Sequence, residues 1–208
     1  MKKLLKAIYR RLKPRPGVES FQAALKALGP GDNVIDCGAN VGDFTVQLAA
    51  TGATVYAFEP DPVAFKVLAE RTRGMANVHL STSAVSSKEG TAKLYFHEKR
   101  AADALLASTG SSLVESKTNV NPDDFEEVQL VRLADVVASL GSVKLMKMDI
   151  EGHEIDVLND LLDSGEARRI ERSFVELHDR KNPHLGAATD ELRERIRRSG
   201  MNFDLSWH

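Results

Sequence analysis

Segments typical of strands and of helices alternate along most of this 208-residue chain, and this alternation limits its fold more than any other feature. Short apolar runs alternate with amphipathic stretches, several of which end at a glycine. The runs expected to form core strands are residues 33–37, 54–60, 77–85, 144–150, 169–177 and 201–207. The stretches expected to form helices are residues 18–28, 43–52, 62–74, 154–165 and 189–200. This order predicts an α/β, doubly wound, Rossmann-like fold, with a mainly parallel sheet and helices on both faces.

Residues 97–125 depart from this order. They form a long polar stretch between two further expected strands, residues 91–96 and 126–133, ahead of the fourth core strand. Structureless loops of such length are uncommon in compact domains and are often lids or binding loops. The sequence therefore predicts a substrate-side insertion, and an irregular surface loop without a role is the alternative.

The first 18 residues also differ from the rest. Seven Lys and Arg residues occur before the first acid, Glu19, among apolar residues at helical spacing that Pro14 and Pro16 bring to an end. Such a basic amphipathic segment suits contact of residues 1–15 with an anionic membrane surface or an acidic partner. The alternative is a helix packed on its own domain. Residues 19–208 are of a length that suits one domain.

Composition excludes several other classes. The formal net charge of −2 gives no reason to expect nucleic-acid binding. The single cysteine, Cys37, excludes an intrachain disulfide and fits a reducing, cytoplasmic setting. No apolar run approaches the roughly 20 residues that span a bilayer. We therefore expect a cytoplasmic domain, and the sequence indicates no particular oligomeric state.

The loop after the first expected strand carries the first functional signal. In VIDCGANVGDF, residues 34–44, Asp36 ends the apolar run, and Gly38, Asn40 and Gly42 follow at every second position. Ligands bind outside the carboxyl ends of the strands of such sheets, and small residues allow a close approach to the backbone. An acid at this place would repel a pyrophosphate and attract a cation. S-adenosylmethionine carries a sulfonium and an ammonium and no phosphate, so the loop predicts this cofactor.

A second acid supports a nucleoside cofactor. Glu59 ends the second expected strand, 23 positions after Asp36 (59 − 36). Folds of this type place a carboxylate there to accept hydrogen bonds from the ribose hydroxyls. Alone, an acid after a strand is a weak signal, and a purely structural turn is the alternative. Together with the preceding loop it becomes a strong one.

Five stretches together resemble the FkbM-type S-adenosylmethionine-dependent methyltransferases. They are VIDCGANVGDFT, AFEPDPVAF, NVHLSTSAVSS, SSL at residues 111–113, and KLMKMDIEGHEIDVL. They follow the family's order over roughly residues 20–178. The combination of D-x-G-A-N-x-G, E-P and D-I-E-G-x-E is specific, whereas each of these alone is not. The resemblance implies a class I methyltransferase fold and mainly O-methylation of hydroxyl groups on sugars or natural products.

The resemblance also implies which residues bind the cofactor. They are Asp36, Gly38, Ala39, Asn40, Gly42, Glu59, Pro60, Ser83, Ala84 and Asp149. Ser83 and Ala84 would flank the adenine, although STSAV lacks the acid that many class I enzymes have there. The full fold ends in an antiparallel seventh strand, and this chain stops at His208 after the sixth expected strand. Either the seventh strand is missing or a middle segment takes its place.

MDIEGHE and ELHD predict the side of the site where the acceptor reacts. Asp149 ends the fourth core strand, and Glu176 and His178 end the fifth, so they should meet at the rim shared with Glu59. His178 is the first choice for the base that removes the hydroxyl proton, since an imidazole pKa lies near working pH, and Asp149 is the second. A structural histidine is the alternative. The residues expected to bind the acceptor are Glu151, His153, Ser111, Ser112 and Glu176. Glu151 and Glu154 would also be favoured at a helix start by the helix dipole alone.

The sequence thus predicts an S-adenosylmethionine-dependent O-methyltransferase acting on a hydroxylated small molecule, such as a glycan. No fixed ligand spacing demands a metal, so none is expected, although a divalent ion that orients the substrate oxygen stays an alternative. A nicotinamide-dependent oxidoreductase would share the fold and Glu59, but its pyrophosphate requires a glycine pattern that this loop lacks. A non-catalytic module that binds S-adenosylmethionine is the other alternative.

Overall fold

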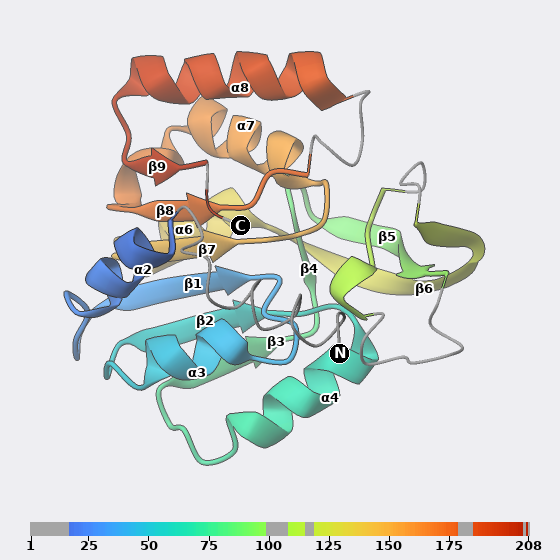
Figure 1. Ribbon diagram of the computed structural model, residues 1–208, viewed down its shortest axis with the longest axis horizontal. Helices are drawn as coiled ribbons and strands as arrows, with labels where there is room; N and C mark the ends of the chain where they lie inside the picture. The colour runs from blue at the N-terminus through green and yellow to red at the C-terminus, as the bar shows by residue number, and fades with distance from the viewer. Residues whose placement is uncertain (1–16, 99–107, 115–118, 179–184, 206, 208) are drawn as a thin grey trace, which may run out of the picture.

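The computed structural model describes residues 17–98, 108–114, 119–178, 185–205 and 207, so the basic segment 1–15 lies outside the described residues. Its main sheet has six parallel strands in the order β3-β2-β1-β7-β8-β9 (Figure 1). They are β1 Asn33–Cys37, β2 Thr54–Phe58, β3 Val78–Ser81, β7 Leu145–Met148, β8 Ser173–Val175 and β9 Phe203–Asp204. The chain builds outward from β1 to β3 and then continues on the other side of β1, so the order reverses between β1 and β7. The prediction of an α/β, doubly wound fold is confirmed.

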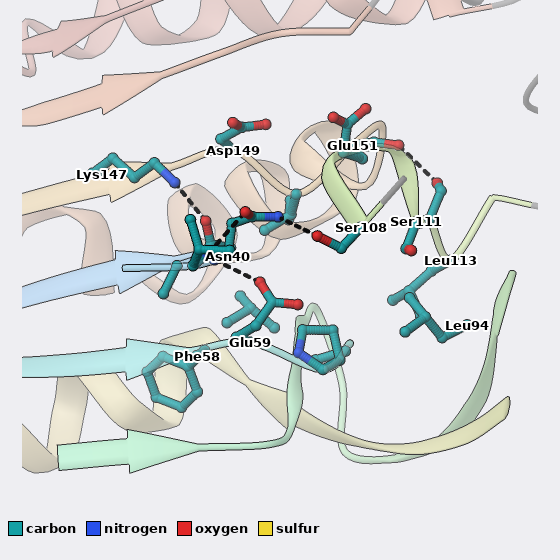
Figure 2. Close-up of a pocket in the computed structure, with 18 of the residues that line it drawn as sticks. Asn40, Phe58, Glu59, Leu94, Ser108, Ser111, Leu113, Lys147, Asp149 and Glu151 are labelled. Carbon is teal, nitrogen blue, oxygen red and sulfur yellow. Dashed lines mark hydrogen bonds between the residues drawn. The ribbon is translucent and has the colours of Figure 1, made fainter. Parts of the chain in front are cut away.

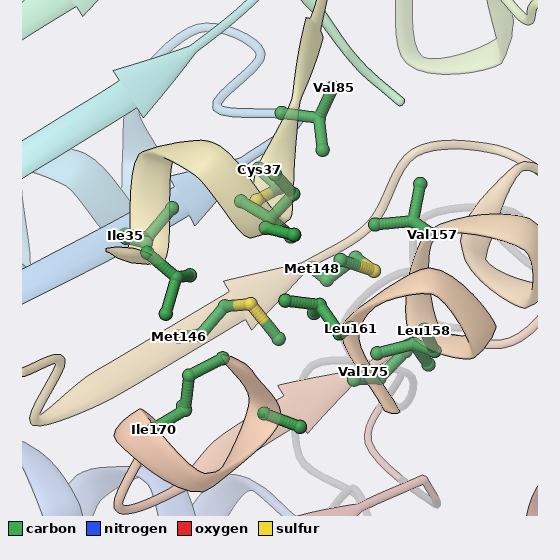
Figure 3. Close-up of a cluster of buried hydrophobic side chains, with 14 of the residues drawn as sticks. Ile35, Cys37, Val85, Met146, Met148, Val157, Leu158, Leu161, Ile170 and Val175 are labelled. Carbon is green, nitrogen blue, oxygen red and sulfur yellow. The ribbon is translucent and has the colours of Figure 1, made fainter. Parts of the chain in front are cut away.

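Helices cover both faces of the main sheet (Figure 1). One face carries α2 Val18–Leu25, α3 Asp43–Ala49 and α4 Pro62–Arg71, and the other carries α6 Leu133–Leu140, α7 Glu154–Ser164 and α8 Gly186–Ser199. On the first face the ring of Phe21 packs edge-on against Phe44 and Phe174. On the second face, side chains of β1, β7 and β8 pack against α7 (Figure 3). No helix in the described part of the chain is long and apolar enough to cross a membrane.

Side chains alternate between the two faces along each central strand. In β1, Ile35 packs in the cluster with α6–α8, and the next residue, Asp36, points toward α3. In β7, Met146 packs in the same cluster as Ile35, and the next residue, Lys147, points toward α3. Lys147 lies directly beside Asp36 in the pairing of β7 with β1. Because helices cover both faces, these two charged side chains lie in the core, where they are 0% and 2% exposed.

A separate three-stranded sheet lies beyond the carboxyl ends of β1 and β2 (Figure 1). It contains β4 Ala84–Ser86, β5 Gly90–His97 and β6 Val120–Arg132 in the order β4-β6-β5. β6 pairs in parallel with β4 and antiparallel with β5. A short 3₁₀ helix, η1 Ser108–Gly110, lies between β5 and β6 in the sequence.

Some expectations for the middle of the chain were wrong. Residues 77–85 do not form one strand, because β3 ends at Ser81 and β4 begins at Ala84 in the other sheet. The stretch 97–125 is not all loop, because β6 begins at Val120 and pairs with β5 there. The described middle strands take no place in the main sheet, since they pair with one another. Helix α6 was not anticipated, although Leu133 and Val137 have helical spacing.

The turn after β1 lies directly against the end of β7. Gly38 has a φ of +75°, and a Cβ atom there would lie 1.8 Å from the carbonyl oxygen of Asp149. The amide of Asp149 donates to the carbonyl of Cys37 at 3.0 Å. Lys147 Nζ donates to the carbonyl of Gly38 at 2.6 Å. Only glycine leaves room for these backbone contacts at the point where the strand order reverses.

We expect Gly38→Ala to lower the free energy of unfolding much more than Gly42→Ala. Both glycines have positive φ, +75° and +87°, where a side chain costs about 1–2 kcal/mol. A Cβ at Gly42 would first meet the side chain of Leu68, whereas at Gly38 it meets backbone that cannot turn aside. Urea unfolding followed by circular dichroism measures both variants. Equal losses would show that the β1 turn can move away from β7 without cost.

Candidate functional site

A pocket opens at the carboxyl ends of β1, β2 and β7, where the strand order reverses (Figure 2). The predicted site residues that line it are Gly38, Ala39, Asn40, Glu59, Pro60, Ala84, Ser111, Ser112, Asp149 and Glu151. The predicted site residues that do not line it are Asp36, Gly42, Ser83, His153, Glu176 and His178. The structure therefore brings most of the predicted residues to one cavity, and their contacts with a ligand stay predictions.

The backbone amides of residues 38–42, in the turn between β1 and α3, all donate hydrogen bonds within the protein. Those of Gly38 and Ala39 donate to the Phe58 carbonyl, that of Asn40 to Glu59 Oε2, that of Val41 to Asn40 Oδ1, and that of Gly42 to the Ala39 carbonyl. Asn40 adopts a positive φ of 49°, a conformation that asparagine tolerates better than most residues. Within residues 38–42 no amide is left to bind an anionic group such as a pyrophosphate.

Glu59 stands on the opposite side of this turn. It is 5% exposed, and its Oε2 and Oε1 accept the amides of Asn40 and Asp61 at 2.7 and 2.8 Å. Burial raises the pKa of Glu59 to about 7, although the two backbone hydrogen bonds act to lower it. Each oxygen keeps a second lone pair, so the carboxylate can still accept a hydrogen bond from a ligand in the pocket.

Lys147 and Asp36 form an ion pair beneath the turn. Lys147 Nζ lies 3.3 Å from Asp36 Oδ1, and Asp36 Oδ2 accepts a hydrogen bond from Thr45 Oγ1 at 2.7 Å. Burial lowers the pKa of Lys147, but the charges of Asp36 and Asp149 outweigh burial and raise it above its usual value. The ammonium therefore stays charged at neutral pH, and it balances the charge of Asp36.

This ion pair corrects the electrostatic interpretation of the loop. Asp36 was expected to attract a cationic ligand, but its side chain is fully buried and its charge is compensated within the protein. A direct role of Asp36 in cofactor binding stays a prediction without that support. Lys147 lines the pocket and was missed. Its signal in the sequence is a single charged residue in an apolar run that helices must cover on both faces.

A second group of charged residues lies at the ends of β7 and β8. His178 is 5% exposed, and its Nδ1 lies 2.9 Å from Glu154 Oε1. Its Nε2 lies 3.3 Å from Glu151 Oε2, 3.6 Å from Asp149 Oδ1 and 3.8 Å from Glu176 Oε1. Four carboxyl groups thus surround one imidazole, and we call these five residues the acidic cluster. The predicted meeting of Asp149, Glu176 and His178 is the arrangement found.

The acidic cluster changes the protonation of His178. Burial lowers the pKa of His178, but the hydrogen bond with Glu154 and the charges of Glu154, Glu151 and Asp149 outweigh it and raise the pKa to about 9. At neutral pH the imidazole is therefore in its cationic form, with a proton on each nitrogen, and it cannot act as a base. The expectation of a pKa near working pH was wrong. The identity of the base stays a prediction, and this protonation favours the second choice, Asp149.

The described part of the insertion forms a wall of the pocket, and three hydrogen bonds hold it to the rest of the domain. Ser111 Oγ donates to Asp61 Oδ2 at 2.8 Å, and Ser112 Oγ donates to the carbonyl of Glu151 at 2.7 Å. Ser108 Oγ accepts from Asn40 Nδ2 at 3.3 Å (Figure 2). Asp61 also caps α4, since its Oδ1 accepts the amides of residues 63 and 64. Residues 99–107 and 115–118 of the insertion lie outside the described residues.

The remaining wall of the pocket is apolar. It contains Phe58, Ala84, Val85, Leu94 and Leu113. Val85 and Leu94 were not among the predicted site residues, although Ala84, from the same small sheet, was. Among the predicted residues that do not line the pocket, His153 has its Nε2 3.1 Å from Ser86 Oγ, and the Ser83 amide donates to Ser81 Oγ.

These groups together fit a nucleoside that carries positive charge. Glu59 can accept from a ribose diol, the apolar wall can hold a base, and Asp149 and Glu151 attract a cation. The turn after β1 offers no amide to a phosphate. The side chains present therefore fit S-adenosylmethionine better than a dinucleotide.

Known proteins match most of this chain. A family model described as the methyltransferase FkbM domain matches residues 36–203. The 31-O-demethyl-FK506 methyltransferase FkbM of Streptomyces tacrolimicus is 34% identical over 176 residues, covering 73% of this chain and 67% of that protein. Methyltransferase 1 of Beauveria bassiana (strain ARSEF 2860) is 28% identical over 176 residues, covering 77% of this chain and 70% of that protein. The crystal structure of methyltransferase FkbM from Methylobacillus flagellatus KT matches with a TM-score of 0.46 and 15% identity, over 82% of this chain and 38% of that chain.

We expect Lys147→Met to lower the free energy of unfolding by about 3–5 kcal/mol, because it leaves Asp36 buried without a counter-charge. Adding Asp36→Asn to this variant should restore much of the loss, since a neutral amide needs no counter-charge. Urea unfolding of both single variants and the double variant measures the coupling between the two side chains. A double variant as unstable as Lys147→Met would contradict this assignment of the buried charges.

Proposed function

This chain belongs to the FkbM methyltransferase family, and on this premise we propose that it transfers a methyl group from S-adenosylmethionine to a hydroxyl group of a small polar acceptor. The observation that carries the proposal is the position of Glu59. Its carboxylate faces a pocket whose remaining walls are an apolar surface and a group of acids. Glu59 suits the hydroxylated sugar ring of the cofactor, the apolar surface suits its flat base, and the acids suit its cationic part.

The nucleoside half of the pocket is held rigid by the protein backbone. Asn40 and Asp61 donate their amides to the two oxygens of Glu59, so the carboxylate is fixed before a ligand enters. Ribose hydroxyls then donate to its remaining lone pairs. Ala84 and Leu94 come from the small sheet and provide the apolar surface for the adenine.

The methyl-transfer half is acidic. When bound, S-adenosylmethionine supplies a methyl group on a positively charged sulfur. Asp149 and Glu151 line this half and favour positive charge there, in the role first expected of Asp36. Asp149 also lines the pocket, whereas His178 does not, so Asp149 is the better placed of the two predicted bases. Alignment of the hydroxyl with the methyl group is the other task of the protein.

The acceptor half is formed in part by the insertion. Ser111 and Ser112 line the pocket, and the insertion brings in Leu113 beside them. Hydroxyl groups and carboxylates recognise a hydroxylated acceptor such as a sugar or a natural product. The similarity to a protein named as a 31-O-demethyl-FK506 methyltransferase supports an oxygen as the methylated atom.

The oxidoreductase alternative is disfavoured by a specific observation. In a nicotinamide site, backbone amides of the first turn hold the pyrophosphate. Here each amide from Gly38 to Gly42 already donates within the protein. A non-catalytic module that binds S-adenosylmethionine would share the pocket, and methyl transfer distinguishes it from an enzyme.

A two-step experiment tests the proposal. S-adenosylhomocysteine should raise the melting temperature of the protein in a concentration-dependent manner, whereas NAD at the same concentrations should leave it unchanged. Transfer of a labelled methyl group from S-adenosylmethionine to a panel of glycosides and polyketide alcohols then tests catalysis. Stabilisation by NAD alone would overturn the assignment of the cofactor. Stabilisation by S-adenosylhomocysteine, with no transfer to any acceptor class, would favour the binding module.

We expect Glu59→Gln to weaken the binding of S-adenosylhomocysteine at least about tenfold, because charge-assisted hydrogen bonds to the ribose contribute about 1.5–3 kcal/mol each. The wild-type affinity should rise with pH up to about 7 and then level off, because the ionised carboxylate is the stronger acceptor and its pKa is about 7. Below that pH, binding must first remove the proton from Glu59. Isothermal titration calorimetry between pH 6 and pH 8 measures this step.

Two controls accompany this measurement. Glu70→Gln changes an exposed glutamate of α4 away from the pocket and should keep both the affinity and its pH dependence. The second control is the 2′-deoxy analogue of S-adenosylhomocysteine. The wild type and Glu59→Gln should differ much less in their affinity for this analogue than in their affinity for S-adenosylhomocysteine. An equal affinity of the wild type for the two compounds would contradict the ribose assignment.

A further inference from the structure

The acidic cluster gathers side chains of the kinds that bind metal ions. Asp149, Glu151, Glu154 and Glu176 place carboxyl groups around the single imidazole of His178. Carboxylate oxygens and imidazole nitrogens are the usual protein ligands of divalent transition metals. The cluster therefore has the donor atoms of a metal site.

Three atoms of the cluster have the spacing of metal ligands. One ligand atom each from Asp149, Glu151 and His178 can be chosen so that all lie within 4.8 Å of one another. His178 Nε2 lies 3.3 Å from Glu151 Oε2 and 3.6 Å from Asp149 Oδ1. Bonds from a metal to oxygen and nitrogen are about 2.0–2.2 Å long, so neighbouring ligands lie about 3 Å apart and opposite ones about 4 Å apart. The two measured separations fall in this range.

Glu154 prepares His178 to act as a ligand. Its Oε1 accepts the amides of Ile150 and Gly152, both at 3.1 Å, so the carboxylate is held in place. Nδ1 of His178, 2.9 Å away, therefore donates to Glu154, and loss of the second proton leaves the lone pair on Nε2. A carboxylate that fixes the orientation and tautomer of a histidine in this way is typical of metal sites.

An oxygen atom without a hydrogen-bond partner points to a ligand in the same place, and strained backbone positions a second carboxylate beside it. Asp149 Oδ1 is buried and, in the part of the chain that the structure describes, has no hydrogen-bond partner. Glu151 adopts a positive φ of 59°, which a glutamate rarely does, and Ser112 Oγ donates to its carbonyl. Backbone strain of this kind persists where surrounding contacts enforce it and is concentrated at functional sites. Here it places the carboxylate of Glu151 at the pocket, beside His178.

We propose that Asp149, Glu151 and His178 bind a divalent transition-metal ion, for which Mn²⁺ is a convenient probe. Imidazole is a ligand of transition metals and carboxylates also bind Mn²⁺, whereas Ca²⁺ and Mg²⁺ take oxygen ligands. Asp149 and Glu151 line the pocket, so the open coordination positions face it and can receive a hydroxyl oxygen of the acceptor. That role in orienting the acceptor rests on the proposed methyltransferase function, whereas binding of the ion does not.

Binding of Mn²⁺ to metal-free protein tests the proposal without any assay of activity. After treatment with EDTA and removal of the chelator, the wild type should take up Mn²⁺ at a single site, seen as loss of the electron paramagnetic resonance signal of the free ion. Glu151→Gln should weaken this binding about tenfold or more by removing a ligand charge. Glu154→Gln should weaken it by about 10–100-fold, because it changes the partner that positions His178.

Matched controls separate the loss of a ligand from loss of the fold. Asp156→Asn removes an exposed carboxylate of α7 and should bind Mn²⁺ as the wild type does. Circular dichroism and titration with S-adenosylhomocysteine report whether each variant is folded. Glu154 is buried, so an unfolded Glu154→Gln variant is set aside, and Glu151→Gln, on the pocket wall, then decides the question alone.

The outcomes distinguish this proposal from the proposed function. Absence of saturable Mn²⁺ binding by the wild type, or unchanged binding by a folded Glu151→Gln variant, overturns the metal site. Either result leaves the binding of S-adenosylhomocysteine as a separate measurement. Conversely, tight Mn²⁺ binding that Glu151→Gln weakens supports the metal site even if S-adenosylhomocysteine does not bind.

Discussion

The contact between the β1 turn and the end of β7 is the constraint on which the rest of this structure depends. Gly38 lies so close to the carbonyl of Asp149 that no side chain fits between them. This approach places the turn that holds Glu59 beside the segment that carries Asp149 and Glu151. The two halves of the pocket are therefore joined by backbone contacts at the one place where the strand order reverses.

The buried ion pair of Lys147 and Asp36 supports this contact from below. Lys147 Nζ donates to the carbonyl of Gly38 and lies beside Asp36, whose other oxygen accepts a hydrogen bond from Thr45. A buried pair of this kind contributes little net stability, because desolvation offsets most of the attraction. Its effect is on geometry. A shift in the register of β1 and β7 would separate the two charges and leave each unpaired in the core, so the pair fixes this register. The ends of the two strands are thus held in place before a ligand binds.

Local patterns in the sequence predicted the main sheet and half of the site. The run that ends in Asp36, the small residues after it and Glu59 after the next strand are signals within one segment each, and they placed the pocket at the correct sheet edge. Interactions between distant segments were not predictable in this way. Lys147 was read as part of an apolar strand because its partner, Asp36, lies 111 positions earlier (147 − 36). The break between β3 and β4 and the pKa of His178 likewise depend on contacts that no single segment encodes.

The distribution of carboxylates bears on the proposed acceptor. The half of the pocket proposed for the nucleoside carries one carboxylate that backbone amides stabilise, whereas the half proposed for methyl transfer adjoins several carboxylates around one imidazole. A neutral polyol can donate its hydroxyl groups to these carboxylates. A carboxylate also attracts a sulfonium, and it attracts a divalent ion more strongly because the attraction scales with charge. In the proposed reaction, recognition of the acceptor and retention of a metal ion would thus draw on the same carboxylates.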